Sequence, residues 1–320
     1  AREAMEFARR IAALRPSSEE SLDFLSVSQN SLASAYRASG ELERSAETYR
    51  GALAIRERLV KEHPDNAGYR RLLLITYGHL GDALGPARAN GLNRLPESVD
   101  AFNRAAEIAQ WISARDPQDR KSWLDLAIAE LRGASSLLEE PDGAAAAVAA
   151  LRKAEPLLLR LTKDDPSNER DRLYLLVLDC QMGKALAAQG RDVEAARRVE
   201  RALAAVKSFR GGPNEANAKT WGIGALLRLG RIRAKSGDPR ALTLANTAAA
   251  ELANGDLKTL GNRWTQASLY ARLGSLYLRM EQTEPATLWL EKSAAVWREM
   301  TVPAALEAQR KAALAAAPLN

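Results

Sequence analysis

The stretch ARLGSLYLRMEQTEPATLWLEKSA, residues 271–294, decides the fold because it joins two helix-forming segments with small residues at fixed spacing. Gly274 lies inside the first segment, although a glycine within a helix costs about 1 kcal/mol relative to alanine. Such a glycine is kept where a second helix approaches closely. We therefore take Gly274 as the anchor of a helical hairpin, and we expect the small residue Ala286 to be its partner on the second helix.

The same spacing recurs along the chain. An aromatic or aliphatic residue follows the anchor at positions +3 and +16 in most copies, and small residues follow at +12 and +19. We expect the larger side chains to fill the space between neighbouring hairpins. The six anchors are Ala33, Gly81, Ser135, Gly183, Gly230 and Gly274, with spacings of 44 to 54 residues and the weakest matches after Ser135 and Gly230.

Prolines and glycines divide each copy into helix, turn, helix and break. The proline that ends a copy lies twelve residues after the +19 alanine, as Pro64 does after Ala52. A capping box of Ser17 and Glu20 is predicted to start the first full hairpin, and Gly40 is predicted to end its first helix. The copy anchored at Gly81 carries an insertion, residues 85–97. We expect Gly91→Trp to be nearly neutral unless this loop folds back into the groove.

These features resemble the tetratricopeptide repeat (TPR). The resemblance rests on LASAYRASGELERSAETYRGA, residues 32–52, and on YARLGSLYLRMEQTEPATLWLEKSA, residues 270–294. It implies an all-α fold, a right-handed α-solenoid of TPR-like helical hairpins, with repeats longer than the usual 34 residues. The predicted divisions are a truncated repeat at 1–16, repeats at 17–64, 65–117, 118–166, 167–213, 214–256 and 257–302, and a C-terminal capping helix at 303–320.

A narrower resemblance concerns YRGALAIRERLVKEHPDNAGYRRLLLITYGHLGDALG, residues 49–85. It is similar to the C-terminal TPR regions of certain bacterial serine/threonine protein kinases. The same sequence pattern also occurs in stand-alone TPR proteins, so a kinase domain upstream and a stand-alone protein both stay open. The chain starts at Ala1 without methionine, so we expect an excised piece of a longer protein. The sequence leaves the compartment unknown: a cytoplasmic location is favoured, and the outer side of the membrane stays open for a membrane-anchored kinase.

The composition excludes several classes of function. A net charge of +6, from 46 basic and 40 acidic residues without a basic run, does not indicate nucleic-acid binding. No apolar stretch reaches the roughly 18 residues of a membrane span. The single cysteine, Cys180, permits neither an internal disulfide nor a multi-cysteine metal site. The two histidines, His63 and His79, have no catalytic context, so we expect no enzyme activity, cofactor or metal.

Helical geometry predicts the binding face. Each residue turns 100° in an α-helix, so positions −3, +1 and +4 from the anchor share one side, with −2 at its rim. The TPR resemblance implies that this side lines a concave surface that binds a protein or peptide. The predicted partner-binding residues are Asn30, Ser34, Arg37, His79, Asp82, Arg132, Ser136, Lys184, Arg228, Arg231 and Arg272.

The interpretation is a protein- or peptide-binding scaffold in a larger bacterial signalling protein. In the sharper hypothesis Arg132, Lys184 and Arg231 contact an acidic or extended segment. In the alternative the face is solvated and paired internally, for example Arg132 with Glu139. Two other functions stay open: a solenoid that senses a small ligand, and a homodimer formed through Met5 and Ile11 of the truncated N-terminal helix.

Overall fold

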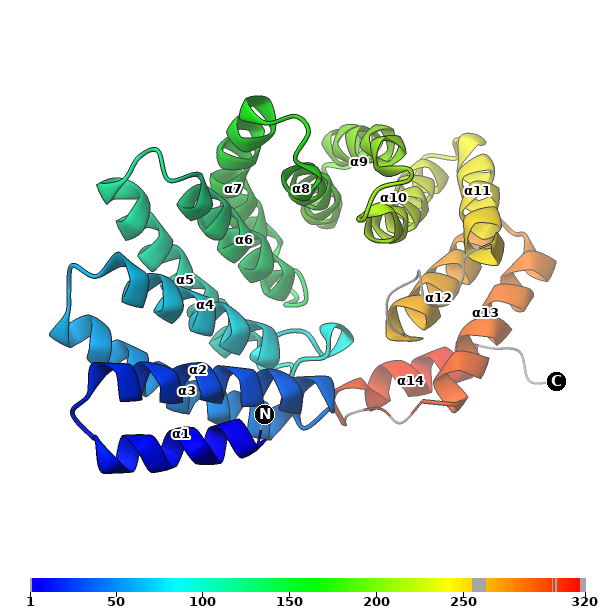
Figure 1. The fold of residues 1–320 in the computed structure, drawn as a ribbon. Helices are drawn as coiled ribbons and strands as arrows, with labels where there is room; N and C mark the ends of the chain where they lie inside the picture. Colours follow the sequence, from blue (N-terminus) through cyan, green and yellow to red (C-terminus); the bar gives the residue numbers. More distant parts are fainter. Residues whose placement is uncertain (1, 255–262, 301, 303, 317–320) are drawn as a thin grey trace. The chain divides into compact units, whose positions relative to one another are not determined.

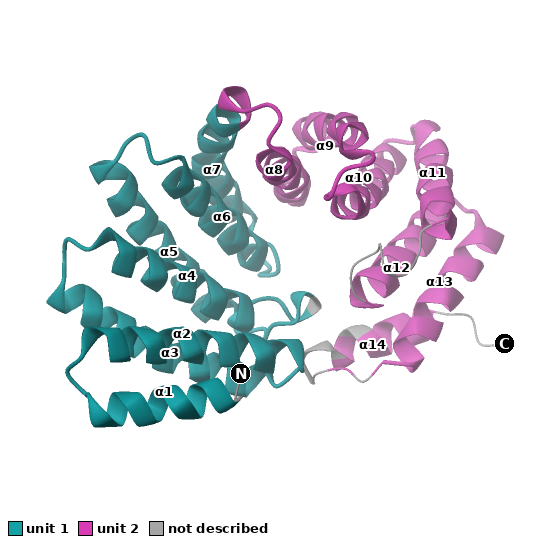
Figure 2. Ribbon diagram, in the orientation of Figure 1, with its two compact units in different colours: residues 1–161 teal, residues 162–320 magenta. Residues whose placement is uncertain are grey.

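The computed structural model describes residues 2–254, 263–300, 302 and 304–316, and these residues form helices and no strands. The fold class is therefore all-α, as predicted, and it is an α-solenoid of helical hairpins. The chain comprises two compact units, Ala1–Leu161 and Thr162–Asn320 (Figure 2). No helix in the described ranges combines the length and the apolar character that crossing a membrane requires.

Unit 1 is a stack of antiparallel helices. We call the first helix of each hairpin its A-helix and the second its B-helix. The A-helices of unit 1 lie along one side of the stack and the B-helices along the other (Figure 1). The helices are α1 (Arg2–Leu14), α2 (Glu19–Ala38), α3 (Leu42–Glu62), α4 (Ala67–Leu84), the short 3-10 helix η1 (Ala87–Ala89), α5 (Leu95–Arg115), α6 (Arg120–Leu137) and α7 (Ala144–Asp164), of which α2, α4 and α6 are A-helices.

Unit 2 repeats this arrangement, and its A-helices α8, α10 and α12 contact one another in order. The helices are α8 (Glu169–Ala188), α9 (Asp192–Val206), the 3-10 helix η2 (Lys207–Phe209), α10 (Glu215–Lys235), α11 (Arg240–Asn254), α12 (Arg263–Arg279), α13 (Thr283–Arg298) and α14 (Ala304–Ala316). The division into repeats stays a prediction. Its boundary at 256/257 and the predicted start of the last helix at Pro303 lie outside the described residues.

A short polar cap starts four of the A-helices, two residues after the proline that ends the preceding helix. The side chains of Ser18, Asn66, Asp119 and Asn168 each accept a hydrogen bond from a backbone N–H of the first helical turn, at 3.0–3.3 Å. Such caps satisfy backbone donors that have no partner inside the helix. The predicted capping box at Ser17 is wrong by one residue, because Ser18 is the cap and also donates to Glu20.

Left-handed residues make the turns inside the hairpins. Gly40, as predicted, and the corresponding Gly190 and Gly237 have φ values of +82°, +74° and +68°. This conformation costs glycine little because it has no Cβ atom. In the last hairpin the same turn is made by Glu281 at φ +60°.

Close helix contacts confirm the role of the anchors. A Cβ atom on Gly274 would lie 2.7 Å from Leu290 Cγ and 3.1 Å from the Ala286 carbonyl oxygen. The second helix therefore passes directly over Gly274, with Leu290 against the glycine inside the hairpin rather than between hairpins. Gly81 and Gly183 meet Phe102 and Val199 in the same way.

Two anchors carry variations on this contact. Gly230 meets Leu276 of the next A-helix, so the weakest sequence copy also packs differently. In the hairpin anchored at Ala33, Ser45 at position +12 donates to the Ala33 carbonyl at 2.8 Å. Ser98 makes the corresponding bond to the Gly81 carbonyl at 2.8 Å, which ties the A-helix to the B-helix.

The insertion after α4 is a folded part of unit 1. Leu92, Asn93 and Arg94 donate backbone hydrogen bonds at 2.8 Å to the carbonyls of Ala83, Gly85 and Leu84. A Cβ atom on Gly91 would lie 2.4 Å from the Gly85 carbonyl oxygen. The loop folds back onto the chain, so the exception stated for Gly91→Trp applies: backbone atoms fill the space, and the substitution is not expected to be neutral.

The two glycines Gly274 and Gly78 provide a matched test of the close contact. Gly274→Ala should lower the free energy of unfolding by about 1–3 kcal/mol, since the added methyl overpacks the contact with Leu290. Gly78→Ala on α4 meets no atom within 4 Å and should raise it by about 0.5–1 kcal/mol through helix propensity. Urea unfolding followed by circular dichroism measures both. Equal changes in the free energy of unfolding for the two substitutions would contradict the close contact between Gly274 and Leu290.

Candidate functional site

A buried polar network lies beneath the A-helix face of unit 1. Arg56 of α3 is only 3% exposed, and it donates to Ser26 Oγ at 3.1 Å and to the Leu72 carbonyl at 2.6 Å. It also contacts the hydroxyl of Thr76. In the amide orientation that satisfies all partners, the Asn30 oxygen accepts from Arg56 at 2.6 and 2.9 Å. Burial lowers the pKa of Arg56 to about 10, which leaves the guanidinium charged at neutral pH.

Two predicted partner-binding residues are therefore part of the interior. Asn30 is 9% exposed within the Arg56 network. Ser136 is fully buried, and its hydroxyl is 2.9 Å from that of Ser98. Neither side chain can reach a partner on the surface.

The other predicted residues of unit 1 are brought together on α2, α4 and α6. Ser34 is exposed and shares a hydrogen bond of 2.8 Å with the buried Tyr49 hydroxyl. The ring of Tyr49 lies 5.6 Å from that of His79. Asp82 pairs with Arg132 Nη1 of the next hairpin at 2.7 Å, so the internal partner of Arg132 is Asp82.

Arg37 holds the insertion onto α2. It donates to the carbonyls of Ala89 and Asn90 at 3.0 and 3.3 Å, and the Asn90 amide donates back to the Arg37 carbonyl at 3.0 Å. The guanidinium of Arg37 is thus bound within the chain. The sequence analysis left open that the loop folds back, but no motif in the sequence indicated the contact with Arg37 of α2.

His79 is a half-buried histidine among charged groups. Its Nδ1 atom is buried and makes no hydrogen bond within the described residues. Burial is the main cause that lowers the pKa of His79, and the nearby cations of Arg132, Arg56 and Arg37 lower it further. The carboxylate of Asp82 acts in the opposite direction. His79 is therefore neutral at physiological pH.

In unit 2 the predicted residues lie on α8, α10 and α12, where Arg231 is exposed and Lys184, Arg228 and Arg272 are partly exposed. Arg272 donates to the Gly224 carbonyl of α10 at 3.0 Å. Cys180 is buried, and burial raises the pKa of its thiol to about 12 although Arg228 and Arg272 lie nearby. Such a thiol is not a nucleophile at neutral pH. Arg231 is exposed and makes no ion pair within the described part of the chain.

The two units differ sharply in the charge of their A-helices. In unit 1, α2, α4 and α6 carry six basic and six acidic residues. In unit 2, α8, α10 and α12 carry eleven basic and four acidic residues, and α12 has no acidic residue. The predicted residues Lys184, Arg228, Arg231 and Arg272 all lie on these three helices, whereas Arg132 belongs to unit 1.

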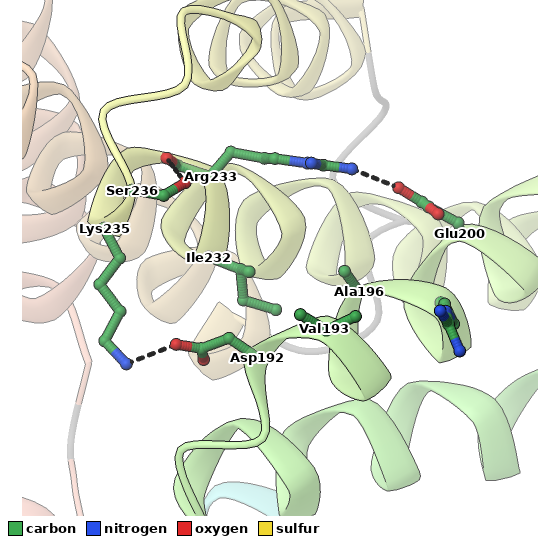
Figure 3. A pocket seen from close by; sticks show the side chains of 9 residues that line it. Asp192, Val193, Ala196, Glu200, Ile232, Arg233, Lys235 and Ser236 are labelled. Carbon is green, nitrogen blue, oxygen red and sulfur yellow. Dashed lines mark hydrogen bonds and ion pairs between the residues drawn. The ribbon is translucent and has the colours of Figure 1, made fainter.

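A pocket that the sequence did not predict lies between α9 and α10, with a volume of about 530 Å³. Figure 3 shows Val193, Ala196 and Ile232 between two ion pairs. The ion pairs join Lys235 to Asp192 at 2.8 Å and Arg233 to Glu200 at 2.8 Å. Val193 is 69% exposed, although it is a β-branched apolar residue.

Comparison with known families and structures agrees with this architecture. Residues 26–65 match the family model of the tetratricopeptide repeat. The structure is similar to that of BtubC (BKLC) from P. vanneervenii, with 19% identity, a TM-score of 0.53 and coverage of 78% of this chain and 87% of that one. It is also similar to the apo form of RapI, with 11% identity, a TM-score of 0.51 and coverage of 85% and 97%.

No curated protein matches the sequence significantly. The match at 26–65 supports a tetratricopeptide repeat in that part of the chain, and the two structures support the α-solenoid fold. At these levels of identity the similarity to the two structures concerns the fold alone.

The half-buried position of His79 predicts a pH dependence of stability. Its pKa in the folded protein is below the ordinary value of 6.5, so the unfolded chain binds more protons as the pH falls through 6.5. The free energy of unfolding contributed by His79 is therefore present above pH 6.5 and is lost below it. Urea unfolding at pH 7.5 and 5.5 should show a smaller pH-dependent loss for His79→Gln than for the parent. An NMR titration that places His79 at or above 6.5 would contradict this interpretation.

Proposed function

We propose that the chain is a protein-interaction scaffold whose basic A-helix face in unit 2 binds an acidic, extended segment of a partner protein. The observation that carries this proposal is the excess of eleven basic over four acidic residues on α8, α10 and α12. Helical repeats offer extended surfaces for such segments, and complementary charge favours encounter and specificity. Lys184 and Arg231 are the residues we assign to this contact.

The face of unit 1 has a different role in this proposal. Its charges are balanced, Arg132 is paired with Asp82, and Arg37 is bound to the insertion. We therefore exclude Arg132 from the partner-binding set and treat the remaining polar residues of unit 1 as support for the stack. The six predicted repeats form one binding module with two compact units, in a larger bacterial signalling protein of the kinase-associated type.

The described residues of the two units do not bring together the ionisable groups that catalysis requires. The thiol of Cys180 is protonated, and His79 is held neutral among cations and one carboxylate. Within the described residues no group of three or more His, Cys, Asp or Glu side chains is placed to bind a metal ion. We therefore assign the chain a binding role.

A charge reversal tests the proposed face. The double variant Lys184→Glu/Arg231→Glu should lose the binding of an acidic partner by at least about tenfold, because each contact changes from attraction to repulsion. Arg9→Glu/Arg10→Glu on α1 makes the same change in net charge at exposed positions and should bind like the parent. Affinity capture is carried out with the parent and the two double variants, each at low and at high salt. The partner proteins that each of the three retains are then compared. Recovery of the same partners on all three would overturn the proposed face.

Self-association is a second candidate, favoured by exposed apolar residues at the N-terminal end. Phe7 and Leu14 of α1 are 59% and 83% exposed, and Phe7 lies edge-on to Phe24 of α2 at 6.3 Å. The sequence interpretation named Met5, which is buried at 3% exposure, so the surface for self-association is the one around Phe7.

Light scattering after size exclusion tests this surface. If α1 pairs with a second copy, Phe7→Glu should convert a concentration-dependent dimer into a monomer, because a charge replaces the apolar contact. Leu278→Glu on α12 changes a similarly exposed apolar residue in unit 2 and should leave the dimer intact. A parent protein that is monomeric at all concentrations would exclude this candidate.

A further inference from the structure

The pocket between α9 and α10 has a counterpart in unit 1. The repeat anchors define corresponding positions in the two places. Val193 and Glu200 lie two residues before and five residues after Ala195, and the same offsets from Ser45 give Glu43 and Arg50. Both pairs of residues lie on the B-helix that precedes an A-helix, on α9 before α10 and on α3 before α4.

In unit 1 these positions are covered by the chain itself. Glu43 pairs with Arg94 at 2.9 Å, and Arg50 pairs with Glu97 at 2.7 Å. Arg94 belongs to the irregular segment that follows α4, whereas Glu97 lies in the first turn of α5. On the B-helix side of the counterpart groove, position 43 therefore contacts the irregular segment and position 50 contacts the start of α5.

On the A-helix side of the counterpart groove, the insertion also contacts the corresponding residues. Ile232 and Arg233 lie two and three residues after Gly230, and the same offsets from Gly81 give Ala83 and Leu84. The carbonyls of Ala83 and Leu84 accept the backbone hydrogen bonds of Leu92 and Arg94. The side chain of Leu92 packs against the core cluster that contains Ala83 and Tyr49. The insertion thus covers the groove from both helices.

The copy anchored at Gly230 has no such insertion. Its A-helix α10 ends at Lys235, and its B-helix α11 starts at Arg240 after a tight turn at Gly237. Because this connection is shorter, it does not cover the groove. The groove is therefore an open pocket of about 530 Å³, and Val193 in it is 69% exposed. We propose that this pocket, the α9–α10 groove, docks an irregular segment of another protein in the manner in which residues 85–94 cover their own groove.

The side chains of the groove define the chemistry of that segment. Val193 replaces Glu43, so the position that binds Arg94 in unit 1 accepts an apolar side chain in unit 2. Asp192 and Glu200 are already paired with Lys235 and Arg233. Arg197, one helical turn beyond Val193, is exposed and has no ion pair within the described ranges. The matching segment carries two apolar side chains followed by a carboxylate.

This inference goes beyond the proposed function, which concerns the A-helix face and an acidic partner. The groove is assigned to residues of α9 and to the end of α10, and its recognition is mainly apolar. Different variants therefore test the two surfaces.

A peptide derived from the insertion tests the proposal. The probe is GPARANGLNLLPE, the sequence of residues 85–97 with Arg94→Leu, labelled with fluorescein and titrated with the full chain in a fluorescence-anisotropy assay. Leu92 and the new leucine supply the apolar contacts. Glu97, which pairs with Arg50 in unit 1, supplies the carboxylate for Arg197, which lies three residues before Glu200, the counterpart of Arg50. We expect saturable binding that a scrambled peptide does not reproduce. Val193→Glu and Arg197→Glu should each weaken it by about tenfold or more, since both change central contacts of the groove.

Matched variants separate the outcomes. Leu278→Glu and Arg279→Glu change an exposed apolar residue and an exposed arginine of α12, and they should leave the affinity unchanged. Arg197→Gln, a milder change, should weaken binding less than Arg197→Glu, and unchanged melting temperatures show that the variants are folded. The absence of saturable binding, or binding that Val193→Glu and Arg197→Glu do not weaken, overturns the inference. If only Lys184→Glu/Arg231→Glu loses binding, the peptide binds the A-helix face. That result would overturn the proposed docking in the α9–α10 groove, but it would not contradict the proposed function.

Discussion

The close approach of the two helices of a hairpin at Gly81, Gly183 and Gly274 is the constraint on which the rest of the structure depends. At Gly81, Gly183 and Gly274 even a single Cβ atom would come within 2.5–2.8 Å of a side chain of the facing helix. The backbones can be this close only where the A-helix presents no side chain. The larger residue of the B-helix then occupies the space, and its burial offsets the low helix propensity of glycine. In each of these hairpins the position of the A-helix relative to the B-helix is therefore fixed.

The fixed pairing of the two helices determines where functional side chains can lie. Since one stripe of each A-helix is used against its B-helix, the neighbouring stripes carry either buried polar groups or exposed charges. In unit 1 the polar groups are joined to one another through Arg56, Arg132 and Arg37. In unit 2 the A-helices keep an excess of basic residues instead. Two units with the same backbone plan thus present different chemical surfaces.

Sequence periodicity predicted the hairpins well because small anchors and left-handed glycines are local requirements. Gly274 and Gly40 are examples in which the residue type alone specifies the geometry. The candidate site was less predictable, because long side chains reach between hairpins. Nothing near Asn30 in the sequence indicates that Arg56, 26 residues later, will bury it. The packing of the insertion was also missed, since its contacts at Arg37 and Gly91 join residues that no periodic pattern relates.

The insertion shows how such a protein can acquire new surface. Phe102 lies 21 residues after Gly81, whereas Val199 lies 16 residues after Gly183, yet both side chains meet their glycine in the same way. The connection between an A-helix and its B-helix can therefore grow without disturbing the contact that holds the hairpin together. The length of the connection is thus independent of the contact at the anchor, although residues of the connection such as Leu92 pack against the core. A change in loop length can therefore alter the surface that a hairpin presents while the glycine contact between its helices stays the same.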